Sequence, residues 1–115
     1  MNGIGRKAIA AAFLAATLFA APAHAQTEGP SISVLANCAG AIAAHADLDV
    51  LTYPRGASGA WADVLGRVLA RLNTMEGVEG MTGRYAASAA RSYWLEQSAS
   101  ERETAANQCR TRFGS

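Results

Sequence analysis

Charged residues are scarce in this sequence, and they form no basic cluster. They make up 17 % of the 115 residues, and the formal net charge is +1. A nucleic-acid-binding domain carries a clustered basic face, and anionic lipid attracts polybasic segments. The sequence has neither feature. We therefore expect no nucleic-acid partner and no electrostatic attachment to a membrane.

Motifs for catalysis and cofactor binding are also lacking. The sequence contains no G-x-S-x-G, no phosphate-binding loop, no dinucleotide fingerprint and no EF-hand loop. His45, Asp47 and Asp49 are close in sequence, but on a helix their side chains point in different directions, whereas metal ligands must converge. We therefore expect no catalytic residue, no metal and no cofactor, and a protein that is not an enzyme.

The sequence has only one long apolar run, and it lies near the N-terminus. Residues 8–21 carry no charge, but they are too few for a bilayer-spanning helix, which needs about 20 residues. Arg6 and Lys7 precede the run, and Ala23-His24-Ala25 follows it. This pattern predicts a bacterial secretory signal peptide over residues 1–25, cleaved after Ala25. We expect the mature protein to be periplasmic or secreted, without stable insertion into the membrane.

Two other fates of this region fit the sequence less well. An uncleaved membrane anchor would need a longer run, and Pro22 interrupts this one. Leu35-Ala36-Asn37-Cys38 resembles a bacterial lipobox, but residues 26–33 separate it from the apolar run. Lipidation of Cys38 would also leave Cys109 without a partner. Cleavage after Ala25 is therefore the favoured interpretation.

Cysteine occurs only twice, at Cys38 and Cys109. An exported protein meets oxidising conditions, which favour a disulfide between them. A mature chain of about 90 residues forms one small domain of marginal stability, so covalent support matters. Closing a loop of about 70 residues stabilises the fold by about 4 kcal/mol in the chain-entropy model. The prediction is a structural disulfide.

Apolar residues recur at helical spacing through the rest of the chain, and no segment alternates as a strand would. After a flexible lead-in at residues 26–30, we expect a single helical domain over residues 31–115. Ser31 is the predicted N-cap of a first helix over residues 32–46. Pro54 and Gly56 then favour a turn.

Three further helices are expected after this turn. Ser58 is the predicted cap of the second, and Gly77 ends it; the third covers about residues 84–97. The fourth begins at Ser100, whose hydroxyl and the Glu103 side chain match a capping box. The predicted fold is therefore all-α: a small bundle of three to four short helices, with the disulfide between the first and the last.

Aromatic residues are the best candidates for a contact surface, because they are enriched at the centres of interfaces. Helical spacing predicts that one aromatic residue of the second helix belongs to the core, together with three aliphatic ones: Trp61, Leu65, Val68 and Leu72. The third helix has apolar residues on two sides. We therefore predict that a partner protein contacts one or more of Tyr85, Tyr93 and Trp94.

These features predict a small exported interaction protein that binds an unknown protein of the cell envelope. In size, helicity and single disulfide the chain is similar to periplasmic acid-stress chaperones, which gives an alternative function. Without its signal peptide the chain keeps 8 of its 10 basic residues against 9 acidic ones, so acid would leave the basic groups uncompensated and open the bundle. A membrane-surface role for the second helix and a small enzyme are weaker alternatives.

Overall fold

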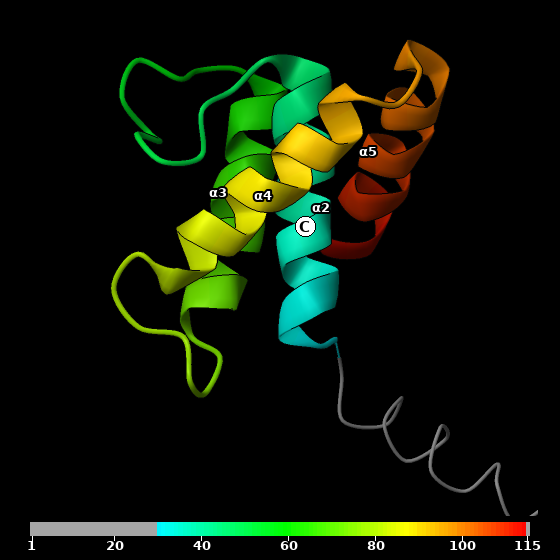
Figure 1. Ribbon diagram of the computed structural model, residues 1–115. Helices are drawn as coiled ribbons and strands as arrows, with labels where there is room; N and C mark the ends of the chain where they lie inside the picture. The colour runs from blue at the N-terminus through cyan, green and yellow to red at the C-terminus, as the bar shows by residue number, and fades with distance from the viewer. Residues whose placement is uncertain (1–29, 115) are drawn as a thin grey trace, which may run out of the picture. The chain divides into compact units, whose positions relative to one another are not determined.

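Helices are the regular secondary structure of the part of the chain that the structure, a computed structural model, describes. This part covers residues 30–114, and no strand occurs in it. The predicted signal peptide and nearly all of the predicted lead-in lie outside it. The helices are α2 (Ile32–Ala46), α3 (Ala60–Asn73), α4 (Thr82–Leu95) and α5 (Ala99–Phe113), shown in Figure 1. The all-α prediction is confirmed.

Helix α2 is the centre of the bundle, and α3, α4 and α5 all pack against it. Its sequence is rich in alanine, so neighbouring helices can approach closely. Two larger residues, Leu35 and Ile42, are fully buried within it. The residues from 35 to 44 are buried with the exception of Asn37. A short helix can be surrounded in this way only if its side chains are small.

Helix α3 supplies the largest aliphatic part of the core. Leu65, Val68 and Leu72 are fully buried, as their helical spacing leads one to expect. Trp61 differs from them, because it is half-buried at the edge of the core. One face of its indole is covered by the Arg110 guanidinium, 4.7 Å from the ring centroid, and the His45 ring stands edge-on to it at 5.0 Å.

The disulfide joins α2 to α5, as predicted from the sequence. Cys38 and Cys109 lie with their Cα atoms 5.5 Å apart and are separated by 71 positions in the chain. Both residues are buried. The bond therefore links the first and last helices of the described part of the chain across the interior.

The predicted helix starts were right for α2 and wrong for α3 and α5. Ser31 caps α2, its hydroxyl accepting a hydrogen bond from the Val34 amide at 3.1 Å. Ser58 does not cap α3; Gly59 occupies that position with φ 101°, a conformation that favours glycine. The true capping box of α5 lies two residues before the predicted one, at Ser98 and Glu101. The motif S-x-x-E also fits this earlier pair, and the sequence does not rank the two.

The third predicted helix begins and ends about two residues too late. Helix α4 covers Thr82–Leu95 and includes Gly83 in its first turn. A Cβ at this position would lie 3.0 Å from Leu72 Cγ and 3.1 Å from Val78 Cγ1. Gly83 precedes the predicted start of this helix, but its lack of a side chain lets α4 start against the core.

Candidate functional site: a groove between two helices

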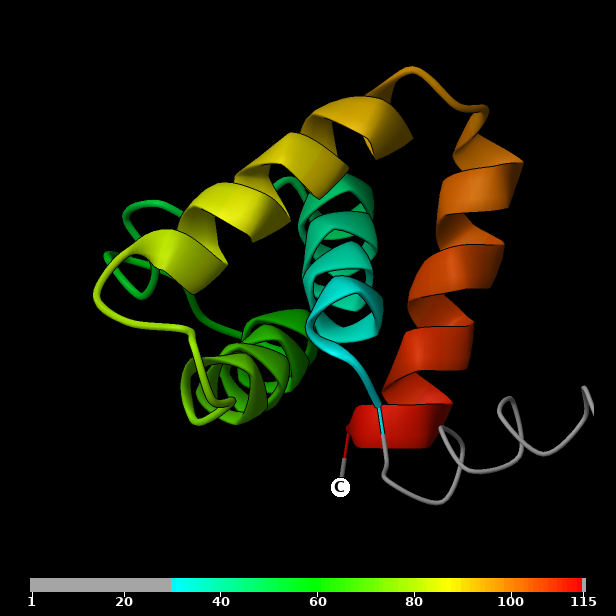
Figure 2. The ribbon, with the colours of Figure 1, turned by 60° about the horizontal axis from the view of Figure 1, so that its bottom comes forward.

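Helices α4 and α5 pack against α2 but make almost no contact with each other. Figure 2 shows them diverging from a shared corner, with α2 between them. An open groove of about 1130 Å³ lies along this seam. It is lined by Ser33, Val34, Ala36, Asn37, Cys38, Ala86, Ala89, Ala90, Trp94, Ala105, Gln108, Cys109 and Arg112.

The lining of the groove is mainly apolar and small. Alanines of all three helices, Val34 and the disulfide form most of it. Ser33, Asn37 and Gln108 are polar and exposed. Among the described residues that line it, Arg112 alone carries a charge. The groove therefore offers a smooth apolar surface with one cationic position.

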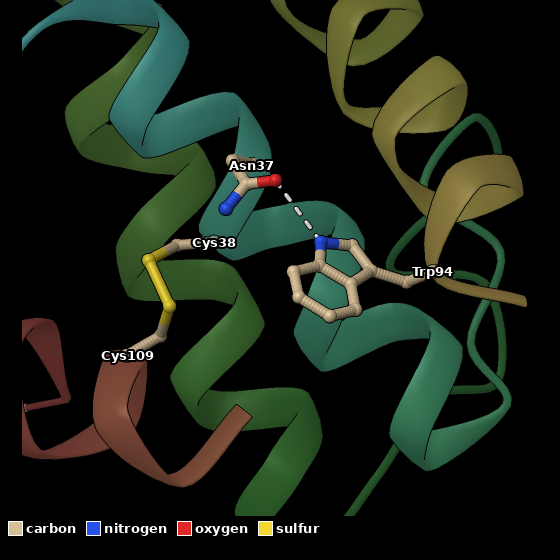
Figure 3. The surroundings of a disulfide bond; sticks show 4 residues. All are labelled: Asn37, Cys38, Trp94 and Cys109. Carbon is tan, nitrogen blue, oxygen red and sulfur yellow. Dashed lines mark hydrogen bonds between the residues drawn. A yellow bond between two sulfur atoms is a disulfide. The ribbon is translucent and has the colours of Figure 1, made fainter. Parts of the chain in front are cut away.

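Two adjacent residues of α2 hold the walls of the groove. Cys38 is bonded to Cys109 of α5, and the Asn37 side-chain oxygen accepts a hydrogen bond of 3.0 Å from the Trp94 indole nitrogen of α4. Figure 3 shows these two connections leaving α2 in different directions. Trp94 is half-buried. A covalent bond on one side and a hydrogen bond on the other keep the walls in place.

Arg102 holds the corner between α4 and α5. Its guanidinium donates to the Gln97 carbonyl at 2.6 Å and to the Leu95 carbonyl at 3.3 Å. The last carbonyls of a helix have no partner within that helix. Arg102, in the first turn of α5, therefore satisfies the end of α4 and fixes how far the two helices diverge.

The three aromatic residues predicted to contact a partner do not form one surface. Tyr85 is 62 % exposed and lies outside the groove, whereas Trp94 lines it. Tyr93 is 55 % exposed and lines a smaller adjoining hollow together with Trp94. The Tyr93 and Trp94 rings meet edge-on, 5.2 Å apart, where these two surfaces join. Of the predicted residues, only Trp94 belongs to the groove.

Sequence reasoning missed the alanine wall of the groove and Asn37. Ala86, Ala89, Ala90 and Ala105 are typical helix formers, and nothing in their spacing distinguishes an open face from a packed one. Asn37 had no signal as a partner for a tryptophan 57 positions later. Only the arrangement of the helices reveals them.

Most arginines in the described part of the chain form no ion pair. One ion pair occurs there, Arg91 with Asp47 at 3.5 Å. Arg71 and Arg112 instead lie 5.3 Å and 5.0 Å from the Phe113 ring centroid. Such cation–π contacts leave the charge free to act on its surroundings.

No catalytic arrangement emerges from the residues that the structure describes. His45 contacts the Trp61 ring. Within residues 30–114, no three His, Cys, Asp or Glu side chains come close enough to hold a metal ion. A backbone hydrogen bond from Leu51, 2.9 Å long, lowers the pKa of the exposed Asp49 carboxylate. The groove is therefore the feature with the clearest capacity to bind.

Comparison with known proteins gives no relative from which a function could be transferred. No protein-family model, no curated protein and no solved structure matches this chain. None of the described helices is long and apolar enough to cross a membrane. We therefore infer the function from the geometry of the groove.

Proposed function

We propose that this chain is a small exported binding protein without catalytic activity, and that it holds an apolar segment of a protein partner in the groove between α4 and α5. The observation that carries the proposal is an apolar groove whose two walls are fixed to α2 by the disulfide and by the Asn37–Trp94 hydrogen bond. Preorganised walls lower the entropic cost of binding.

The open shape of the groove favours a polypeptide over a small molecule. Pockets for drug-sized ligands have volumes of roughly 300–1,000 Å³ and enclose most of the ligand. This groove measures about 1130 Å³ and is open along its length. A helix is roughly 10–12 Å wide and rises 1.5 Å per residue, so the volume corresponds to about two helical turns.

The alternative functions receive less support from the contacts. A membrane-surface role for α3 would need its apolar stripe to be accessible, but Leu65, Leu69 and Leu72 are buried in the core. An acid-stress chaperone would need carboxylate contacts whose loss opens the bundle. In the ion pair between Arg91 and Asp47 the Asp47 side chain is almost fully exposed, so loss of this pair removes little stability.

Site-specific photo-crosslinking in the producing cell tests the proposal. A photoreactive amino acid at Gln108, an exposed residue of the groove, is expected to crosslink to one discrete protein. The same amino acid at Ala70, which is exposed on α3 and outside the groove, serves as the matched control. Equal crosslinking at both positions would contradict the proposal, as would an enzymatic turnover that is lost in His45→Ala.

A further inference from the structure

We infer that the occupant of the groove is an amphipathic helix of a partner protein, bearing an apolar residue against Trp94 and a carboxylate seven positions later against Arg112. This inference rests on the proposed function and adds the chemistry of the bound segment. Its support comes from the charges along the groove, the spacing of two lining residues and the size of the lining side chains.

One cation lies at the open end of the groove, on α5, which forms one wall of it. Arg112 belongs to the last turn of α5 and lines the groove. Arg71 of α3 adds a second cation near Phe113. No described carboxylate lies within 4.0 Å of Arg112. The open end of the groove therefore attracts an anionic group.

The distance between the two ends sets the spacing on the occupant. Ala105 lies near Trp94, because both line a smaller hollow beside the corner. Arg112 follows Ala105 by seven residues on α5, which corresponds to a rise of about 10.5 Å. A helix lying along the groove spans the same length with residues i and i+7, and these lie on one face.

The polarity of the occupant follows from its helix dipole. The N-terminal end of a helix is partly positive and its C-terminal end partly negative. The favourable orientation therefore places the C-terminal end of the occupant near Arg112, and its N-terminal end at the corner. The apolar residue then precedes the carboxylate in the partner sequence.

A helix fits the lining better than an extended strand does. Ala86, Ala89, Ala90 and Ala105 present methyl groups along the groove, and small residues let helices approach closely. The residues that the structure describes include no strand that an extended peptide could join. Helix-in-groove recognition, with anchors at i and i+7, is the mode that this surface allows.

A second copy of this chain is a poorer occupant. The most exposed large apolar residues that it could insert are Tyr85 and Tyr93 of α4. The residues seven positions after them are Ser92 and Ser100. Neither tyrosine is therefore followed by a carboxylate at the spacing that Arg112 of another copy requires, and the charge complementarity points to a different protein.

Calorimetric titration with synthetic helical peptides tests this inference. The probe is a capped alanine-based amphipathic peptide with leucine and, seven residues later, glutamate. Three matched peptides carry glutamine or lysine in place of the glutamate, or the same two residues in reversed order. The glutamate peptide is expected to bind about two- to fivefold more tightly than the glutamine peptide, the range for an exposed charge pair.

Substitution of Arg112 links this preference to the groove. In Arg112→Gln the glutamate and glutamine peptides should bind equally, and in Arg112→Glu the lysine peptide should bind best. Arg67→Gln, at an exposed position of α3 outside the groove, should keep the preference for glutamate. Circular dichroism of each variant verifies that it is folded.

The possible results of the binding experiments overturn different parts of the inference. Equal binding of all peptides to the unmodified protein would overturn the charge pairing, and the groove would remain the binding site if crosslinks at Gln108 persist. Binding of dodecanoate in the groove, without binding of any peptide, would show that the occupant is a lipid and would overturn the inference. Tighter binding of the reversed peptide would overturn the proposed polarity.

Discussion

Gly40 of α2 lies directly against Ala90 of α4. A Cβ atom added at Gly40 would be 2.5 Å from the Ala90 Cβ and 2.5 Å from the Arg91 backbone nitrogen. The two helices therefore cross at a point where only glycine fits. This crossing sets the position of α4 over α2, and with it one wall of the groove.

Gly40→Ala is expected to destabilise the protein. Alanine normally stabilises a helix by up to about 1 kcal/mol relative to glycine, but here its methyl group meets backbone atoms that cannot turn aside. Overpacking of this kind costs about 1–3 kcal/mol. Thermal unfolding should show a lower melting temperature, by roughly 4–8 °C for each kcal/mol by which the overpacking exceeds the gain in helix propensity.

Gly66→Ala is the matched comparison within α3. Its added Cβ would meet the Tyr53 hydroxyl, the end of a side chain, which could move aside by giving up its 2.8 Å hydrogen bond to the Ala62 carbonyl, at a cost of about 1 kcal/mol. The loss of stability should therefore be smaller than for Gly40→Ala. A melting temperature of Gly40→Ala equal to or above that of the unmodified protein would contradict the close crossing.

Removing the disulfide should weaken the fold severely. The bond closes a loop across 71 positions, and the chain-entropy model assigns about 4 kcal/mol to a loop of this length. The variant carrying both Cys38→Ala and Cys109→Ala should unfold at a much lower urea concentration. Equal midpoints for this variant and the oxidised protein would contradict a stabilising role.

Arg102→Met should loosen the corner between α4 and α5. The substitution leaves the Gln97 and Leu95 carbonyls without their charged donor, and the expected cost is about 1 kcal/mol. Arg67→Met, at an exposed position of α3, is the control. Urea unfolding of the two variants provides the comparison, and equal midpoints would show that Arg102 has no such role.

Acidification should change stability only slightly. The Leu51 amide holds the pKa of Asp49 below its ordinary value of 3.8, so this carboxylate stabilises the fold above that pH. The contribution is lost as the pH falls below 3.8 through the lowered pKa of the folded state. Between pH 7 and pH 5 the melting temperature should therefore stay constant.

Dye binding distinguishes this behaviour from that of an acid-activated chaperone. A hydrophobic dye should find no new apolar surface between pH 7 and pH 2, the range in which the carboxylates become protonated. A large increase in dye fluorescence within this range would favour the chaperone alternative, because such a protein must expose apolar surface on acidification.

Sequence reasoning predicted the all-α class and the disulfide because their signals are local or involve only two residues. The spacing of Leu65, Val68 and Leu72 likewise marks one helix face. The sequence does not identify the N-cap of α5, because both Ser98 and Ser100 fit the capping-box motif. Which serine caps the helix depends on where α5 begins in the fold. Local patterns thus located elements to within about two residues.

The groove could not be predicted, because it is a property of three helices together. Its width depends on the contact of Gly40 with Ala90 and on Arg102 at the corner. Neither interaction has a periodic signature in the sequence. Trp94 is predicted as a contact residue from its type and from the two apolar sides of its helix, whereas its partner Asn37 is visible only in the fold.

Mapping amide chemical shifts during titration with the leucine–glutamate peptide tests the central claim most directly. If the groove is the binding site, the largest shifts should occur at Val34, Ala90 and Gln108, and the Trp94 indole resonance should move with them. Shifts confined to Tyr85, or to α3, would contradict the account.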